Sequence, residues 1–312
     1  MTLKPTITVG IPAYNEEANI KSLLEALLLQ KLVSVELKEI IVVSDGSNDQ
    51  TVTLARSILD PRVTVFDNPD RKGASIRQNE IIKNTHGDIL VMLNGDAMPA
   101  YDNFIEEIVA PLLKDPKIGL VSADTIAVSP QMFIENVLGQ AHELKKHMYR
   151  QINSGNNSHM CTGLARAFSR QLYSQMHWES DLPEDAFSYF MCIKLGFKFY
   201  YARNSQILFR VPANLEDYIK QSQRFTGGKE KMMKYFPNGF AKREYYIPLK
   251  VWIKSSLLFI PFHPISVLGF FLNVYIGLFK PKMAYQSKWK ISETTKLAIN
   301  KNNDKSTQMP TS

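Results

Sequence analysis

Residues 7–16 of the chain read ITVGIPAYNE, an apolar run that leads directly into a polar turn. A short run rich in β-branched residues and closed by turn-forming residues is typical of a buried β-strand. Residues 17–30 continue with leucine and isoleucine side chains at helical spacing. The two patterns alternate further along the chain, with strands predicted at 40–43, 63–66 and 89–93 and helices at 51–59 and 74–84.

This alternation of strands and helices predicts an α/β fold with a mostly parallel central sheet that carries helices on both faces. Ligands of such folds bind in the crevice beyond the carboxyl ends of the strands. The polar residues that directly follow each strand are therefore the first candidates for a functional site.

The bulk composition is that of a globular protein, with 312 residues of which 45% are hydrophobic and 21% charged. The formal net charge of +7 favours an anionic ligand, an anionic membrane or nucleic acid, without choosing among them. Cys161 and Cys192 form no CxxC pair and indicate reduced thiols. Residues 1–5 lack the apolar core of a secretory signal, so we expect the mature protein to begin in the cytosol.

Carboxylate-bearing segments follow the predicted strands or begin a predicted helix. Each segment alone could be a helix cap or a turn. Together they would line the crevice of a parallel sheet. The segments are Tyr14-Asn15-Glu16, Asp45-Gly46-Ser47-Asn48-Asp49, Asn94-Gly95-Asp96 and Glu184-Asp185, with Gln221-Ser222-Gln223-Arg224-Phe225 after them.

These residue types are the ones that a nucleotide-sugar site needs. A carboxylate and a nearby aromatic ring can hold the base and the ribose. A divalent cation bound by Asp oxygens can neutralise a diphosphate leaving group. A second carboxylate can take the proton of an attacking hydroxyl, and an Arg side chain can contact the diphosphate through its bidentate fork.

Over residues 6–228 the sequence resembles family 2 glycosyltransferases of the GT-A fold. The resemblance rests on the Pro-x-Tyr-Asn-Glu opening at 12–16 and the Asp-Gly-Ser-x-Asp turn at 45–49. It also includes the Lys72-Gly73 pair and the asparagine that follows it, Asn79. In combination these motifs are highly specific for the family.

The resemblance implies an inverting transferase that moves a sugar from a UDP-, GDP- or dTDP-linked nucleotide sugar to a lipid-linked or saccharide acceptor. Asp96 would be the ligand of Mg²⁺ or Mn²⁺ as the last residue of the family's Asp-x-Asp motif. Asp185, beside Glu184, would be the general base. Nine residues are expected to bind the nucleotide sugar, the first three at its nucleoside: Tyr14, Glu16, Asp45, Pro12, Lys72, Asn79, Asn94, Gln221 and Arg224.

Three positions depart from the family's pattern. Asn94 replaces the first Asp of Asp-x-Asp and can still hydrogen-bond to ribose or water. Ser44 replaces an Asp that often precedes Asp45, which leaves Asp45 as the carboxylate that binds the base. Phe225 replaces the Trp of the Gln-x-x-Arg-Trp motif of processive members, and the chain has no room for their several spanning helices. We therefore expect transfer of one sugar, or a few, to a membrane-held acceptor.

The composition changes near residue 251, and Lys254 is the only charged residue between 251 and 279. Pro261 and Pro264 interrupt this stretch, and its longer piece would extend about 24 Å as a helix, less than the roughly 30 Å hydrocarbon core. Both flanks are basic. We interpret 251–279 as a kinked pair of helices that lie in, or re-enter, one leaflet at the cytoplasmic face of the cell membrane. A soluble helical subdomain or an oligomer interface is the alternative.

The resulting organisation has three parts. A GT-A catalytic domain is expected at 1–245 and a membrane-associated helical segment at 246–285. A basic and polar tail, expected to be largely disordered, occupies 286–312.

Two rival functions remain open at this point. A sugar nucleotidyltransferase would need a Gly-rich loop after its first strand, where this chain has Pro-Ala-Tyr-Asn-Glu. A catalytically degenerate scaffold is favoured by Asn94 and Ser44, whereas the intact carboxylates argue against it. Nucleic acid is not expected as a partner, because no recognised module or aromatic interleaving accompanies the basic residues.

Overall fold

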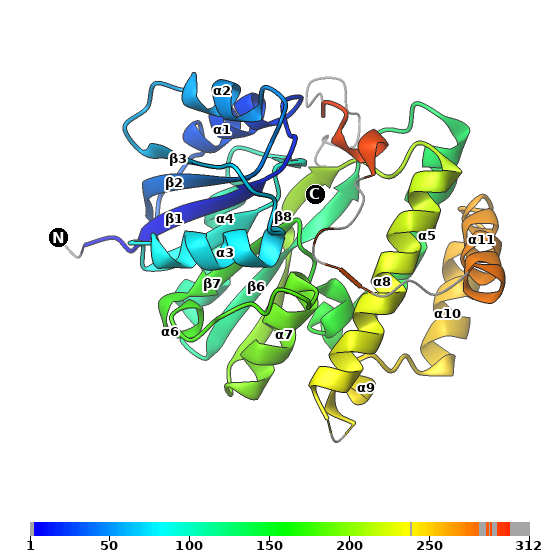
Figure 1. The fold of residues 1–312 in the computed structure, drawn as a ribbon. Coiled ribbons are helices and arrows are strands. Elements are labelled where there is room, and N and C mark those ends of the chain that lie inside the picture. The colour runs from blue at the N-terminus through cyan, green and yellow to red at the C-terminus, as the bar shows by residue number, and fades with distance from the viewer. Residues whose placement is uncertain (1–2, 238, 281–284, 287, 289–291, 300–312) are drawn as a thin grey trace.

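The computed structural model describes residues 3–237, 239–280, 285–286, 288 and 292–299. An eight-stranded sheet runs through its centre in the order β3-β2-β1-β4-β7-β6-β8-β5 (Figure 1). The strands are β1 (Thr6–Ala13), β2 (Glu36–Asp45), β3 (Val63–Asn68), β4 (Ile89–Leu93), β5 (Ala97–Pro99), β6 (Ile118–Ala127), β7 (Ala165–Ser169) and β8 (Lys198–Phe209).

The first four strands confirm the predicted alternation. β1 pairs in parallel with β2 and with β4, and β3 pairs in parallel with β2. The connecting helices are α1 (Ile20–Leu28), α2 (Thr51–Arg56) and α3 (Ala74–Lys83). α3 lies close against β1 because residue 10 is a glycine: a Cβ there would approach Ile81 Cγ2 to 2.4 Å.

The prediction of a mostly parallel sheet is wrong, because the sheet is mixed. β7 pairs in antiparallel orientation with β4 and β6, and β5 does so with β8, whereas β6 and β8 are parallel. The clear alternation of strands and helices ends at residue 93, and β5 to β8 come from the less regular sequence beyond it. Antiparallel neighbouring strands need no crossover helix, so an alternation of strands and helices in the sequence cannot predict them.

Two hydrophobic cores cover the two faces of the sheet. Side chains alternate along a strand, so β4 sends Ile89, Val91 and Leu93 into one core and Leu90 and Met92 into the other. The first core includes side chains of α1 and α4 (Phe104–Lys114), and the second includes side chains of α3, α6 (Arg170–Tyr173) and α7 (Glu184–Lys194).

Further helices lie beyond one edge of this body. α5 (Phe133–Arg150) and α8 (Leu215–Tyr235) stand beside the sheet, α9 (Phe240–Glu244) follows α8, and α10 (Leu249–Phe259) and α11 (Ser266–Phe279) pack on α5 (Figure 1). α10 and α11 are separated at the two prolines, as the sequence predicts. Of the helices in the described residues, none combines the length and the apolar character that crossing a membrane requires.

The described part of the tail differs from the predicted disorder over 286–312. A short 3-10 helix, η3 (Glu293–Lys296), is followed by Ile299, whose side chain is buried in the first core. The packing of this one apolar side chain into the core is a long-range contact that the polar composition of the segment does not reveal. Residues 300–312, which the same prediction covered, lie outside the described residues.

Candidate active site

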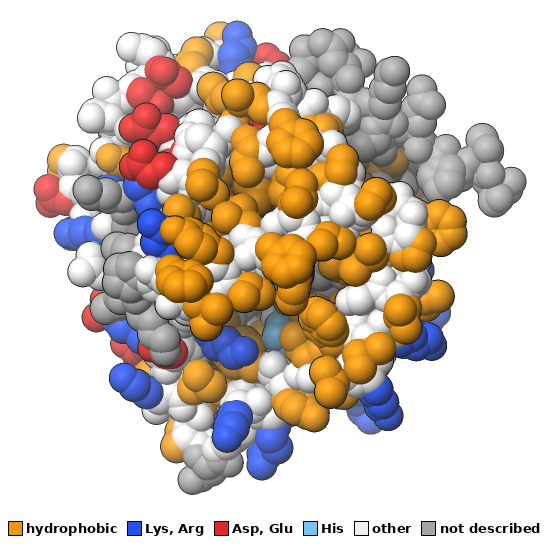
Figure 2. Space-filling view, turned by 90° about the vertical axis from the view of Figure 1, so that its right-hand side faces the viewer, with side chains coloured by type: hydrophobic (Ala, Val, Ile, Leu, Met, Phe, Trp, Pro, Cys, Tyr) orange, Lys and Arg blue, Asp and Glu red, His pale blue; other side chains and the backbone are white. Residues whose placement is uncertain are grey.

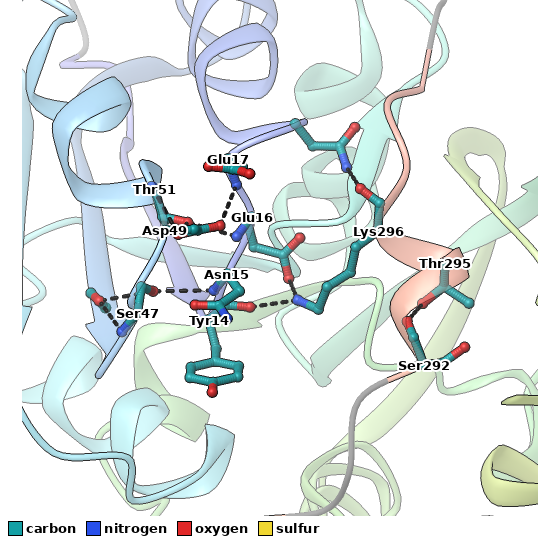
Figure 3. A network of polar contacts seen from close by, with 12 residues as sticks. Tyr14, Asn15, Glu16, Glu17, Ser47, Asp49, Thr51, Ser292, Thr295 and Lys296 are labelled. Carbon is teal, nitrogen blue, oxygen red and sulfur yellow. Dashed lines mark hydrogen bonds and ion pairs between the residues drawn. The ribbon is translucent and has the colours of Figure 1, made fainter.

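The turns that follow β1 and β2 are tied to each other by hydrogen bonds. The Asn15 backbone N–H donates to Ser47 Oγ at 3.1 Å, and the Glu16 backbone N–H donates to Thr51 Oγ1 at 2.6 Å (Figure 3). Asn15 adopts a left-handed backbone conformation, with φ of 53°. Asparagine tolerates this conformation better than most residues. The two motifs recognised in the sequence therefore form one hydrogen-bonded unit at the ends of β1 and β2.

Asp45 is buried and braces the loop that contains Lys72. Its carboxylate accepts hydrogen bonds from the backbone amides of Lys72 at 2.7 Å and Gly73 at 2.8 Å. Arg77 Nε donates to the same carboxylate at 2.8 Å. The structure therefore brings Asp45 and the Lys72-Gly73 pair into contact, with the Asp45 carboxylate held by these amides and by Arg77, a residue that the motifs did not indicate.

The ring of Tyr14 lies under a guanidinium group. The Arg71 Cζ atom is 4.1 Å from the centroid of the Tyr14 ring. Stacking of a cation on an aromatic face is favourable and produces a flat, partly apolar platform. Arg71 was also missed by the sequence analysis, although its position directly before Lys72 was a signal for it.

Glu16, just after β1, packs against the turn that contains Asp96. Glu16 is buried and lies against Gly95, where a Cβ would approach Glu16 Cγ to 2.6 Å. Burial, and then the charge of Asp96, raise the pKa of Glu16 to about 8. Within the described residues, Glu16 Oε2 has no hydrogen-bond partner. The two carboxylates thus lie close together, one at the end of β1 and one after β4.

Asn94, Glu184 and Asp185 converge around a glycine that sequence reasoning did not single out. A Cβ at Gly163 would lie 3.2 Å from Glu184 Oε1, 3.7 Å from Asn94 Nδ2 and 4.0 Å from Asp185 Cβ. The Asn94 backbone N–H also donates to the Leu164 backbone carbonyl at 3.0 Å. The Asp-x-Asp equivalent and the predicted base therefore border one space.

The start of α7 is fixed by two buried side chains. Arg166 Nη1 donates to the Glu184 carbonyl at 2.9 Å, and Trp178 Nε1 donates to the same carbonyl at 3.0 Å. Arg166 also donates to Ser188 Oγ at 2.6 Å. Arg166 and Trp178 therefore fix the backbone of Glu184, the residue directly before the predicted base. Neither was identified from the sequence, because their role depends on long-range contacts.

Asp185 is half-buried and has an unusually high pKa. Burial and the adjacent charge of Glu184 raise its pKa from the ordinary 3.8 to about 6, against the opposing charges of Arg166 and Arg224. Arg224, on α8, therefore lies near enough to act on the predicted base. Its helix packs closely on the start of α7, since a Cβ at Gly228 would approach Pro183 Cγ to 2.7 Å.

Three of the residues predicted to bind the nucleotide sugar lie within a strand or a helix or are hydrogen-bonded to another part of the protein. Pro12 lies within β1, paired in register with Val43. The Asn79 side-chain amide is occupied by the backbone of Trp178. Gln221 is half-buried on α8, one turn before Arg224.

The residues at this site fit a divalent cation that would bind together with the phosphate groups of a ligand. Among the described residues there is no group of three or more His, Cys, Asp or Glu side chains arranged to hold a metal. Mg²⁺ at phosphate sites, however, is usually bound by one or two carboxylates together with phosphate oxygens and water. Half-buried Asp96, with the unpartnered oxygen of Glu16 close by, matches that arrangement.

Comparison with known proteins places this site in a family context. The sequence profile described as "Glycosyl transferase family 2" matches residues 8–176, which are more than half of the chain. An N-acetylglucosaminyltransferase of Rhizobium meliloti is 24% identical over 239 residues, or 71% of this chain and 55% of that protein. A glucosyl-3-phosphoglycerate synthase of Mycobacterium tuberculosis is 30% identical over 122 residues, or 38% of this chain and 37% of that protein. The chain thus spans about half, or less, of the length of these curated relatives.

Solved structures share the fold. The mannosyltransferase of Pyrobaculum calidifontis, in complex with GDP-Man and Mn²⁺, has a TM-score of 0.58 at 20% identity, covering 89% of this chain and 71% of that chain. The Mycobacterium tuberculosis glucosyl-3-phosphoglycerate synthase, in complex with Mn²⁺, UDP-Glc and phosphoglyceric acid, has a TM-score of 0.51 at 23% identity, covering 72% of this chain and 78% of that chain. With its GT-A-like fold, its ordered strand-end motifs and the profile match over residues 8–176, the chain belongs to glycosyl transferase family 2.

Proposed function

We propose that the protein transfers a sugar from a nucleotide-sugar donor to an acceptor hydroxyl, with inversion at the anomeric carbon. The observation that carries this proposal is the convergence of Asn94, Glu184 and Asp185 around Gly163. Asp96 follows Asn94 by two residues in the turn after β4, and its charge acts on Glu16 just after β1. In this proposal Asp185 serves the attacking hydroxyl and Asp96 serves the leaving group.

Asp185 takes the proton from the acceptor hydroxyl in this mechanism. A general base works best when its pKa lies near the operating pH, and the pKa of about 6 satisfies this condition. Glu184 supports it by raising that pKa, and Arg166 fixes the backbone of Glu184. Inversion requires that a hydroxyl held at Asp185 attack the anomeric carbon from the side opposite the diphosphate, in a single displacement.

Asp96 would hold Mg²⁺ or Mn²⁺ at the diphosphate end of the sugar donor. The ion would supply positive charge that neutralises the departing nucleoside diphosphate. Asn94 Nδ2 and Asp185 both lie beside Gly163, so the Asn94 side-chain amide would bind the sugar or the ribose. Tyr14, stacked on Arg71, provides the platform for the nucleoside.

A membrane surface is the proposed setting, with a lipid-linked or polysaccharide acceptor. Apolar side chains cover the face formed by α10 and α11, and lysine and arginine side chains border it (Figure 2). We call this set of exposed side chains the apolar face: Leu249, Ile253, Leu257, Leu258, Phe262, Leu268, Phe271, Tyr275, Leu278 and Phe279. An apolar face with a basic rim is suited to the cytoplasmic, anionic leaflet of a membrane.

Hydrolysis and binding of a panel of UDP-, GDP- and dTDP-sugars with Mn²⁺ test the proposed function. We expect the detergent-solubilised protein to bind one member and to release its nucleoside diphosphate, and we expect EDTA to abolish the release. Asp185→Asn should keep nucleotide binding and lose transfer. Asp181→Asn is the matched control, because Asp181 is exposed and lies outside the site. A protein that binds no member of the panel would contradict the proposal.

A further inference from the structure

The segment formed by residues 292–299 belongs structurally to the sugar-donor side of the crevice. Asn19, a buried residue at the start of α1, binds this segment through both ends of its side-chain amide. Asn19 Nδ2 donates to the Lys296 carbonyl and Asn19 Oδ1 accepts from the Ile299 amide, each at 2.9 Å. Ile299 itself is 6% exposed and lies in the first core. The backbone on either side of Lys296 is therefore fixed to the fold.

A second set of buried side chains holds the segment at two further points, Thr294 and Ala298. The Asp217 carboxylate accepts from Thr294 Oγ1 at 2.8 Å and from the Thr294 amide at 3.2 Å. Arg210 Nη2 donates to the Ala298 carbonyl at 3.2 Å. Displacing the segment would leave Asn19, Asp217 and Arg210 without these partners, which is costly for buried polar groups. The segment is thus a permanent wall of the site and is poorly suited to act as a removable plug.

Lys296 extends from this wall to the end of β1. Its ammonium group donates to the Tyr14 carbonyl and to Glu16 Oε1 (Figure 3). An ammonium group carries three N–H donors, so the two bonds that Lys296 makes within the described residues leave one donor that a ligand could use. The Lys296 side chain is 17% exposed and therefore retains an opening to solvent.

The charges around Lys296 indicate what that ligand is. Glu16 is surrounded by the charges of Asp96 and Asp49, and Lys296 is the cation that offsets them. Because Glu16 also lies against Gly95, the ammonium group stands beside the Asp96 turn, where the diphosphate is expected. A nucleotide sugar brings further negative charge to this point. A buried, pre-positioned cation there would bind it with little loss of side-chain entropy.

We propose that Lys296 is a residue of the sugar-donor site and that its ammonium group contacts the diphosphate of the nucleotide sugar. The proposal rests on the proposed function. Lys296 lies outside residues 8–176, the part of the chain that matches the family profile. The C-terminal segment would therefore supply to the shared catalytic fold a phosphate-binding cation that this profile does not contain.

Titration of the full chain with UDP and GDP in the presence of Mn²⁺ tests the proposal, with uridine and guanosine measured by competition. We expect Lys296→Met to weaken binding of the preferred nucleoside diphosphate about tenfold or more, as for loss of one charge-assisted contact. The affinity for the nucleoside should stay unchanged. Lys296→Arg should retain most of the diphosphate affinity, and Lys21→Met, at an exposed lysine of α1, should behave as wild type.

A measurement on the wild type removes the dependence on a folded Lys296→Met variant. Saturating nucleoside diphosphate should slow acylation of Lys296 by an amine-reactive reagent, measured by peptide mass spectrometry, while Lys21 reacts as before. Tighter diphosphate binding by Lys296→Met, an equal loss for nucleoside and diphosphate, or unchanged acylation would each overturn the inference. Failure of the wild type to bind either nucleotide would instead overturn the proposed function, and this inference with it.

Discussion

Asn79 and Trp178 pair through both ends of one side-chain amide. Asn79 Nδ2 donates to the Trp178 carbonyl and Asn79 Oδ1 accepts from the Trp178 backbone amide, each at 2.8 Å. Trp178 in turn donates to the Glu184 carbonyl. Asn79, expected from the family resemblance to bind the nucleotide, therefore has a path to the predicted base that runs through Trp178.

Asn79→Ala should lower transfer more than it lowers nucleotide affinity. The change removes two hydrogen bonds to the Trp178 backbone and should destabilise the protein by about 1–3 kcal/mol. The start of α7 would then be less well positioned, so kcat should fall while the Kd of the nucleoside diphosphate changes little. Calorimetric titration and steady-state kinetics provide the two readouts. A large loss of nucleotide affinity with unchanged stability would instead indicate direct contact with the ligand.

Gly163→Ala should impair catalysis without disturbing the fold. The added methyl group would lie 3.2 Å from Glu184 Oε1 and would narrow the space bordered by Asn94 and Asp185. We expect kcat/KM to fall at least about tenfold, which corresponds to about 1.4 kcal/mol of transition-state stabilisation. The melting temperature should stay within a few degrees of the wild type. Gly139→Ala is a suitable control, because a Cβ there meets only Ala127 Cβ at 3.9 Å. Wild-type kinetics for Gly163→Ala would show that this space is not used by the substrates.

The rate of transfer should depend on pH through Asp185. The pKa of this carboxyl is raised to about 6, and a general base acts in its deprotonated form. The rate should therefore fall as the pH drops from 7 through 6 to 5. Measurement of kcat across that range at saturating nucleotide sugar, with the circular dichroism spectrum recorded at each pH, checks the prediction. A flat profile over pH 5–7 in a folded protein would contradict Asp185 as the base.

Removal of the divalent metal should separate nucleoside binding from diphosphate binding. With EDTA, the affinity for UDP or GDP should fall while the affinity for the corresponding nucleoside stays unchanged. Asp96→Ala should show the low affinity even with Mn²⁺ present, because one of the few carboxylate ligands is lost. Calorimetric titrations with and without Mn²⁺ make the comparison. Unchanged metal dependence in Asp96→Ala would rule out Asp96 as the ligand.

Substitution of apolar-face residues by glutamate should release the protein from membranes. Phe271 and Leu278 are 61% and 72% exposed on α11, and burying each in a bilayer surface would contribute about 1.5–3 kcal/mol. The double variant Phe271→Glu and Leu278→Glu should lose flotation with vesicles of phosphatidylcholine and phosphatidylserine. Leu59→Glu, at an exposed leucine near α2, should not. Equal flotation of all three proteins would exclude this face as the membrane contact.

The regular first third of the fold could be predicted from sequence because its signals are local. β1 to β4 are short apolar runs separated by amphipathic helices, and the motifs at their ends lie where the strand pattern places them. The antiparallel insertion of β7 between β4 and β6 carries no such local signal. It depends on which strand edges remain unpaired once the first four strands have assembled, and no sequence period encodes that.

The same limit explains the site residues that the sequence did not reveal. Asp96, Asn94 and Asp185 were accessible because each lies in a recognisable motif. Arg166 and Lys296 were not, since one is buried beneath the site and the other is about 280 residues away from Glu16. Gly163 has meaning only through the three side chains that surround it.

The contact between Lys296 and the residues after β1 also has a consequence for synthesis. Domains form from the amino terminus as the chain emerges from the ribosome. A nascent chain that has emerged only through α11 contains every motif of the family, yet Glu16 still lacks its counter-charge. Residues 292–299 bring Lys296 to the end of β1 only after the whole region that matches the family profile has been made. This contact with the first strand therefore forms late in synthesis, long after β1 itself has left the ribosome.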